Sequence, residues 1–305
     1  MNKKEIDLIV LKEYSKKHNE IFEQFLANQE QIFSNIELKE IDNKIRNLKT
    51  DIANLKFENK DTNLLELELQ NANNQLKTLL KKFNINEKLL SPNYSCSFCE
   101  DTGVINGIRC VHCYMQNYFK KLVDLCGTNL KQIPSIDKID TKIYEENEAN
   151  IKDIISKICN LNTLSKNTIM FFGETGTGKT YLAKSFLKSC LKDFKYSFYV
   201  SSFVLANDLT PNADNFYNTK LQDYIDFDVL VIDDLGAEPR YKNFNERFLN
   251  LINERQEKNK ITLITTNLTL KELANTYSER IFSRLMDKNI SLAFKLSGKD
   301  LRIKK

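Results

Sequence analysis

The chain has 305 residues, enough for two domains, and its 41% apolar and 28% charged residues are ordinary for a folded globular protein. Its net charge of +4 is too small to indicate a nucleic-acid-binding protein by itself. No apolar run approaches the roughly 20 residues of a membrane-spanning helix, and the N-terminus is charged throughout, unlike a signal peptide. We therefore expect a cytoplasmic protein with no membrane contact.

Residues 1–90 are predicted to form a helical, coiled-coil region, because they contain no glycine or proline. Apolar residues recur at alternating spacings of four and three in two stretches separated by the polar residues 58–63. The first stretch has Ile41, Ile45, Leu48, Ile52 and Leu55, and the second has Leu65, Leu69, Ala72, Leu76, Leu79 and Phe83. Two such seams predict an antiparallel helical hairpin in which Ala72 faces a larger side chain. The hairpin is either a plain bundle core or a coil that binds a partner.

Residues 91–130 are predicted to form a small zinc module followed by a linker helix. Two C-x₂-C pairs separated by ten residues are typical of a tetrahedral structural Zn²⁺ site. The ligands would be Cys96, Cys99, Cys110 and Cys113. Four thiolates close the coordination shell, which argues against a catalytic zinc. His112 lies inside the second pair, so a Cys₃His set stays open as an alternative.

The other three cysteines are expected to be buried as small apolar side chains. They lie in apolar helical patterns, at Cys126, Cys159 and Cys190. An odd total of seven, with no export signal, argues against a disulfide framework.

Residues 131–305 are predicted to form an α/β domain. Short apolar runs at 168–172, 197–200, 229–232, 261–265 and 293–296 alternate with helical segments. Strands separated by helices predict parallel crossovers, and hence a parallel sheet covered by helices.

A phosphate-binding loop follows the first of these strands and precedes a helix at 179–191. The sequence fits G-x-x-x-x-G-K-[ST], with Gly173, Glu174, Thr175, Gly176, Thr177, Gly178, Lys179 and Thr180. Glycines let backbone N–H groups turn inward around a phosphate, and the helix N-terminus adds the positive end of its dipole. We expect Lys179 to reach the β- and γ-phosphates of ATP and the Thr180 hydroxyl to coordinate Mg²⁺.

Polar residues end two further strands. Asp233 and Asp234 follow the run at 229–232, where the first acid is placed to hold Mg²⁺ through water and the second to orient or activate the attacking water. Asn267 ends the strand at 261–265 and would polarise that water or contact the γ-phosphate. Without a ligand, all three would be ordinary turn residues.

The motifs together resemble the bacterial helicase loaders, the DnaC/DnaI-type AAA+ ATPases, and their relatives, the IstB-type transposition helpers. The resemblance covers residues 134–303 and is carried by GETGTGKT, VLVIDDLG, ITTNL, SERIFSRL at 278–285 and GKDLR at 298–302. It implies an AAA+ P-loop domain for residues 131–305, with slow, partner-stimulated ATP hydrolysis.

The resemblance also implies roles for individual residues. Asn267 matches the sensor-1 position, and Arg302 falls where these proteins carry a sensor-2 arginine. Arg284 matches the arginine finger, which enters a neighbouring subunit's ATP site and so implies a homo-oligomer. Arg280 lies one helical turn earlier and shares or replaces that role. A surface ion pair is the alternative interpretation of Arg280 and Arg284.

The implied function is a loader that binds the replicative DNA helicase and single-stranded DNA, with ATP hydrolysis as a switch. In DnaI-type loaders a zinc-bearing N-terminal domain docks on the helicase. Two features depart from the wider AAA+ pattern: the second acid is Asp234 instead of Glu, and residues 201–228, which include DNA-contacting helices in loaders, match only loosely. The alternatives are a transposition helper ATPase and a nucleotide-gated scaffold that binds ATP without hydrolysing it.

Overall fold

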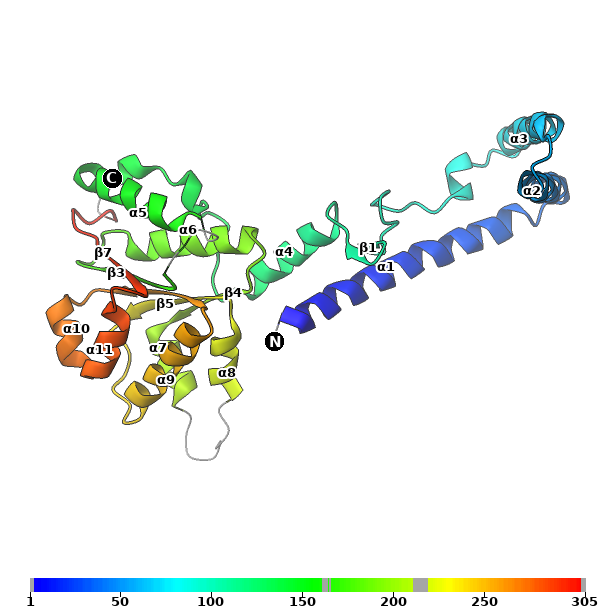
Figure 1. Cartoon of the computed structure of the whole chain (residues 1–305). Helices are drawn as coiled ribbons and strands as arrows, with labels where there is room; N and C mark the ends of the chain where they lie inside the picture. Colours follow the sequence, from blue (N-terminus) through cyan, green and yellow to red (C-terminus); the bar gives the residue numbers. More distant parts are fainter. Residues whose placement is uncertain (1–2, 161–163, 165, 211–218, 303–305) are drawn as a thin grey trace. The chain divides into compact units, whose positions relative to one another are not determined.

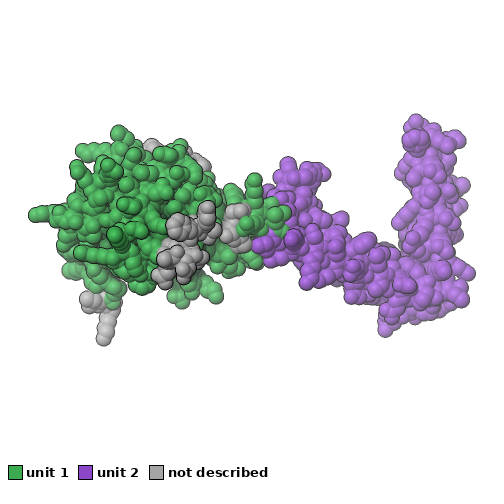
Figure 2. All heavy atoms as spheres, turned by 90° about the horizontal axis from the view of Figure 1, so that it is seen from below, with its two compact units in different colours: residues 1–8, 116–305 green, residues 9–115 purple. Residues whose placement is uncertain are grey.

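The structure is a computed structural model that describes residues 3–160, 164, 166–210 and 219–302. It divides into two compact units, residues 9–115 and residues 1–8 with 116–305, which Figure 2 colours separately. Within the described ranges, no helix is both long and apolar enough to cross a membrane.

The unit of residues 9–115 is mainly helical. It contains most of α1 (Lys3–Ile32), then α2 (Ile36–Phe57), α3 (Asn63–Lys82), the 3₁₀ turn η1 (Glu87–Leu90) and the short strands β1 (Val104–Ile105) and β2 (Ile108–Arg109). The side chain of Asn35 caps α2 by accepting from the backbone N–H groups of Glu37 and Leu38.

The predicted helical hairpin is confirmed by the packing of α2 on α3. Ala72 is 1% exposed and packs against Ile41, Ile45 and Leu48. Ion pairs at opposite ends of the two helices, Lys56–Glu66 and Glu37–Lys82, show that α2 and α3 run antiparallel. The small Ala72 therefore lets three larger side chains approach closely.

The second unit is built around a five-stranded parallel sheet, which confirms the predicted α/β class. The strands are β3 (Thr168–Phe172), β4 (Ser197–Ser201), β5 (Val229–Leu235), β6 (Ile261–Thr266) and β7 (Ser291–Lys295), in the spatial order β4-β5-β6-β3-β7. The central strands are buried on both faces, as near-continuous apolar runs require. The carboxyl ends of β3, β5 and β6 thus lie side by side at one edge.

Helices cover both faces of this sheet, with α5 and α6 on one side and α7, α8 and α9 on the other (Figure 1). The elements are α4 (Tyr114–Leu125), η2 (Ile136–Lys138), η3 (Thr141–Asn147), α5 (Glu148–Ile158), α6 (Lys179–Lys192), α7 (Ser202–Leu209), α8 (Thr219–Asp226), α9 (Phe244–Glu257), α10 (Leu270–Thr276) and α11 (Glu279–Met286).

A buried arginine ties three of these elements together. Arg255 on α9 is 0% exposed, and its guanidinium donates to the carbonyls of Tyr224 (2.7 Å) and Phe227 (2.8 Å) and to the Thr262 hydroxyl (2.9 Å). Burial lowers the pKa of Arg255 to about 9, so the group remains a cation at neutral pH. The planar, multi-donor guanidinium satisfies carbonyls at the end of α8 and holds β6 in place.

The expectation for the scattered cysteines is confirmed at Cys126 and Cys190, which are buried, and is wrong at Cys159, which is exposed. The buried face of α5 ends at Ile158, and Cys159 is the C-cap residue that follows it. Its thiol donates to the backbone carbonyl of Ser156 at 3.7 Å.

Candidate functional site

The loop between β3 and α6 needs its glycines for two reasons. Gly173, Gly176 and Gly178 have φ values of 133°, 83° and 87°, in the left-handed region that favours glycine. A Cβ on Gly173 would also lie 2.0 Å from the carbonyl oxygen of Leu296, and one on Gly176 would lie 2.1 Å from Cγ of Asp300. The segment after β7 therefore packs directly on the loop backbone.

Lys179 begins α6 and points back into the loop. It is 5% exposed, and its Nζ donates to the carbonyls of Gly173 (2.8 Å) and Glu174 (2.6 Å). Burial lowers the pKa of Lys179, and the nearby carboxylates of Asp234 and Asp233 oppose that shift. The Thr177 hydroxyl fixes the same turn by donating to the carbonyl of Glu174 at 2.9 Å.

Asp233 is the centre of a group of hydroxyl donors. It is 4% exposed, and Thr180 Oγ1 lies 3.0 and 3.1 Å from its two carboxylate oxygens. Tyr199 on β4 donates to Oδ2 at 2.5 Å, and Thr265 on β6 donates to Oδ1. A buried carboxylate next to a threonine hydroxyl supplies the oxygen ligands that Mg²⁺ prefers, so the residues fit this ion.

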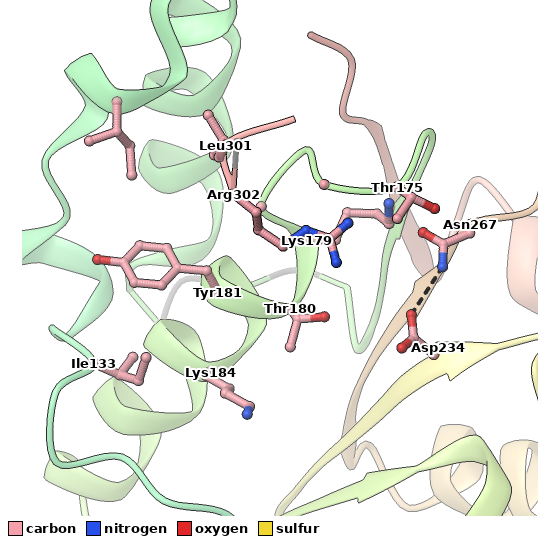
Figure 3. Close-up of a pocket in the computed structure, with 13 residues that line it drawn as sticks. Ile133, Thr175, Lys179, Thr180, Tyr181, Lys184, Asp234, Asn267, Leu301 and Arg302 are labelled. Atoms are coloured by element: carbon pink, nitrogen blue, oxygen red, sulfur yellow. Dashed lines mark hydrogen bonds between the residues drawn. The ribbon is translucent and has the colours of Figure 1, made fainter. Parts of the chain in front are cut away.

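Asp234 is turned away from Asp233 by an irregularity in β5. The β5–β6 register shifts between Ile232 and Leu235, and Asp234 adopts a φ of 56°, which aspartate tolerates better than most residues. Asn267 Nδ2 donates to Asp234 Oδ1 at 3.2 Å (Figure 3). Burial, followed by the negative charge of Asp233, raises the pKa of Asp234, while Lys179 and Asn267 oppose that shift.

Lys179, Thr180, Asp234 and Asn267 help to line a cavity of about 480 Å³. One part is polar and includes Thr175, Lys179, Thr180, Asp234, Asn267 and Arg302, while the other is lined by Ile133, Tyr181 and Leu301 (Figure 3). The apolar side chain of Ile143 also lines the cavity. The volume is in the range of small-ligand sites, and the combination suits a ligand with an anionic and an apolar end.

The three predicted arginines are placed differently. Arg302 lines the cavity, and its Nε and Nη2 lie 3.2 and 3.3 Å from the carboxylate oxygens of Asp300. Arg280 and Arg284 are exposed on α11 and are not among the residues that line the cavity. Neither forms an ion pair within the part of the chain that the structure describes, so that alternative finds no support there. The last motif ends at Arg302, and residues 303–305 lie outside the described residues.

The four predicted zinc ligands converge. The Sγ atoms of Cys96, Cys99, Cys110 and Cys113 all lie within 4.8 Å of one another, with 3.9 Å between the first and third and 3.3 Å between the second and fourth. A tetrahedral site with Zn–S bonds of about 2.3 Å requires sulfurs about 3.8 Å apart. The residues therefore fit Zn²⁺, and the four thiols form the cluster without His112. The His112 ring instead stacks on Phe98, with centroids 3.6 Å apart.

A tight hairpin and a buried carboxylate shape this cluster. β1 and β2 pair antiparallel across Asn106 and Gly107, both with positive φ, which is typical of a type I′ turn. Asp101 accepts from the backbone N–H groups of Ser95 (2.7 Å) and Cys96 (3.0 Å), which fixes the first cysteine pair. The Asn-Gly pair could have been recognised in the sequence as a hairpin turn, whereas no sequence pattern indicated that Asp101 would hold the first cysteine pair.

Residues around the nucleotide site were also missed from the sequence, among them three that contact the predicted site residues. Two of them, Tyr199 and Thr265, donate hydrogen bonds to Asp233. The third, Asp300, lies against Gly176. Thr265 carried a signal, because it lies at the end of β6 just before Asn267, and Asp300 lies within the GKDLR motif. Tyr199 carried none, because it reaches Asp233 through the pairing register of β4 and β5.

The family model for IstB-like ATP-binding proteins matches residues 124–302, more than half of the chain. The chain belongs to this family. It is therefore an ATP-binding AAA+ protein, and the range matched includes the whole cavity described above.

Similar individual proteins include an insertion-sequence protein and a replication initiator. An ATP-binding protein of insertion sequence IS232 from Bacillus thuringiensis is 27% identical over 175 residues, 55% of this chain and 68% of that protein. The chromosomal replication initiator DnaA of Campylobacter curvus is 30% identical over 119 residues, 39% of this chain and 27% of DnaA. This chain thus spans about a quarter of the length of the DnaA relative.

Similar solved structures include two proteins named in the resemblance. The crystal structure of DnaI is 23% identical with a TM-score of 0.44, covering 55% of this chain and 90% of DnaI. The crystal structure of the DnaC helicase loader is 26% identical with a TM-score of 0.43, covering 55% of this chain and 96% of DnaC.

Proposed function

We propose that this protein is an ATP-dependent helicase loader that binds the replicative DNA helicase and single-stranded DNA. One observation carries the proposal: a four-cysteine cluster that fits zinc is joined, in one chain, to an IstB-like ATP-binding domain. The zinc would hold the fold of residues 91–115 rigid and supply no catalysis, because four thiolates leave no open coordination position. That rigid module and the α2–α3 hairpin would form the surface that binds the helicase.

In the nucleotide site, Lys179 would bind the β- and γ-phosphates, while Thr180 and Asp233 would hold Mg²⁺. Bound Mg²⁺ would neutralise charge on the phosphates. Asp234 would orient the attacking water and accept its proton, and Asn267 supports this role because it holds the Asp234 carboxylate at 3.2 Å. Arg302 would contact the γ-phosphate, since it lines the polar part of the cavity.

The site would be completed by a second copy of the chain. Arg280 and Arg284 are exposed on α11 and do not line the cavity of their own chain. An arginine finger that acts in a neighbouring subunit must be exposed in this way. We assign the finger to Arg284 and a supporting role to Arg280. The assembly would then be a head-to-tail homo-oligomer.

Single-stranded DNA would contact the segment that follows β4. Phe203 and Val204, at the start of α7, are 53% and 46% exposed, and Arg240 and Lys242 on the next crossover are exposed cations. Single-strand binding sites combine exposed aromatic side chains with cations. Residues 211–218, between α7 and α8, lie outside the described residues.

A transposition helper ATPase is the second candidate, and the IS232 relative favours it. The two candidates share the ATP site and differ in the partner that they serve. The helper would act with a transposase and would not bind a replicative helicase. A gene position beside a transposase would favour the helper.

The hydrolytic part of the proposal is tested by steady-state ATP turnover. We expect Lys179→Ala to weaken ATP binding and to lower turnover by about a hundredfold or more, because the substitution removes the buried cation proposed to bind the phosphates. Asp234→Asn should retain ATP binding and lose turnover, since the amide cannot accept a proton.

Lys258→Ala is the matched control, because Lys258 directly follows α9 and, among the described residues, forms an ion pair with Glu254 of that helix. It should leave both quantities unchanged. Turnover by the native protein, with helicase and DNA present, that does not exceed turnover by Lys179→Ala would indicate a nucleotide-gated scaffold instead.

A further inference from the structure

The tyrosine on β4 that contacts Asp233 belongs to no recognised motif. Tyr199 pairs in register with Val231, and Ser201 pairs with Asp233, so the Tyr199 and Asp233 side chains share one face of the sheet. They are diagonal neighbours across two parallel strands, a separation that a long aromatic side chain can bridge. The Tyr199 hydroxyl accordingly donates to Asp233 Oδ2 at 2.5 Å.

The two oxygens of Asp233 are held by different donors. Thr265 donates to Oδ1 and Tyr199 to Oδ2, while Thr180 reaches both. Thr180 is also the residue proposed to coordinate Mg²⁺, so its hydroxyl would be engaged by the ion. Among the described residues, Tyr199 would then be the side chain that still donates a hydrogen bond to Oδ2 of Asp233.

The phenol is fixed in place by its surroundings. Its ring lies 4.9 Å from the Lys184 ammonium, and its backbone N–H donates to the carbonyl of Cys126 at 2.8 Å. In this position the hydroxyl is the donor and the Asp233 carboxylate the acceptor of their hydrogen bond.

We infer that Tyr199 is a positioning residue for magnesium, which orients the Asp233 carboxylate for the ion without touching the nucleotide. The inference rests on the proposed ATP and Mg²⁺ site and adds a residue to it. Donors that orient a metal-binding carboxylate commonly control metal affinity, because they hold its lone pairs in the binding direction.

The test is binding of a fluorescent ATP analogue as a function of Mg²⁺ concentration, with Tyr199→Phe in the full chain. We expect the Mg²⁺ concentration for half-maximal tight binding to rise roughly tenfold to a hundredfold. Affinity for the analogue in EDTA should equal that of the native protein, because the phosphate contacts of Lys179 do not involve Tyr199.

Tyr224→Phe is the matched control, since Tyr224 on α8 donates to Asp208 at 2.7 Å and lines no part of the nucleotide cavity. It should show a comparable change in thermal stability with a native Mg²⁺ dependence. A Tyr199→Phe protein with native Mg²⁺ dependence, or one that loses affinity equally in EDTA, overturns this inference alone. A native protein whose analogue binding does not respond to Mg²⁺ overturns the proposed site as well.

Discussion

Replacing Arg284 with alanine should lower ATP turnover by about a thousandfold or more, because an arginine finger stabilises charge that develops on the transferred phosphoryl group. ATP binding should stay close to native, since Arg284 is exposed on α11 and lines no part of its own cavity. Turnover and analogue binding measured on the same preparation would separate the two effects.

A mixing experiment shows whether the arginine acts between subunits. Arg284→Ala keeps a complete phosphate-binding loop, and Lys179→Ala keeps the finger. In a random one-to-one mixture, about a quarter of head-to-tail interfaces pair an intact loop with an intact finger. Two inactive variants should therefore regain activity when mixed.

Two further arginine variants serve as controls for this result. Arg280→Ala, one turn earlier on α11, should give a smaller loss if Arg284 is the finger and an equal loss if the two share the role. Arg247→Ala on α9 should be neutral, because it removes an arginine from another helix. Mixtures that remain inactive, with native-like oligomers, would contradict a shared site.

The second large effect concerns the four-cysteine cluster. We expect the purified protein to contain one Zn²⁺ per chain, and Cys110→Ser or a strong chelator to unfold the region around β1 and β2. Structural zinc contributes about 10–16 kcal/mol of binding free energy to small domains. The hairpin itself has only two paired residues per strand and would not be stable alone.

Metal analysis, together with hydrogen exchange of residues 91–115, measures this effect. Cys159→Ser is the control, because it removes an exposed thiol outside the cluster and should keep both the zinc and the protection. If the native protein binds no zinc, or if Cys110→Ser retains it, the four thiols are not the ligand set. ATP binding by residues 131–305 should survive zinc loss, since the cavity includes no cysteine.

The features that the sequence could predict are those that depend on local pattern. Buried parallel strands require apolar runs, and β3, β5 and β6 appear at the expected places. Phosphate binding by a loop and zinc binding by four thiolates each require particular residues at particular spacings. The glycine pattern of the loop and the cysteine pattern of the cluster could therefore be recognised in the sequence. Ala72 could be placed opposite larger residues because a heptad seam fixes which side chains meet.

The features that the sequence could not predict depend on tertiary placement. Tyr199 reaches Asp233 only because β4 pairs with β5 in a particular register. Asp300 lies against Gly176 because the segment after β7 returns to the loop, where Leu301 N–H donates to the Gly176 carbonyl at 3.0 Å. Cys159 was expected to be buried and is exposed, since the end of α5 could be located only to within a residue or two.

The proposed action of this ATP-binding protein on a replicative helicase is tested by co-purification of the full chain with the host's replicative helicase. The experiment is done with ATP, with ADP and without nucleotide, and the mass of any complex is then measured. We expect a complex of the helicase with several copies of this chain, formed by the native protein with ATP and lost on zinc removal. Absence of any complex in all three nucleotide states would contradict the proposal.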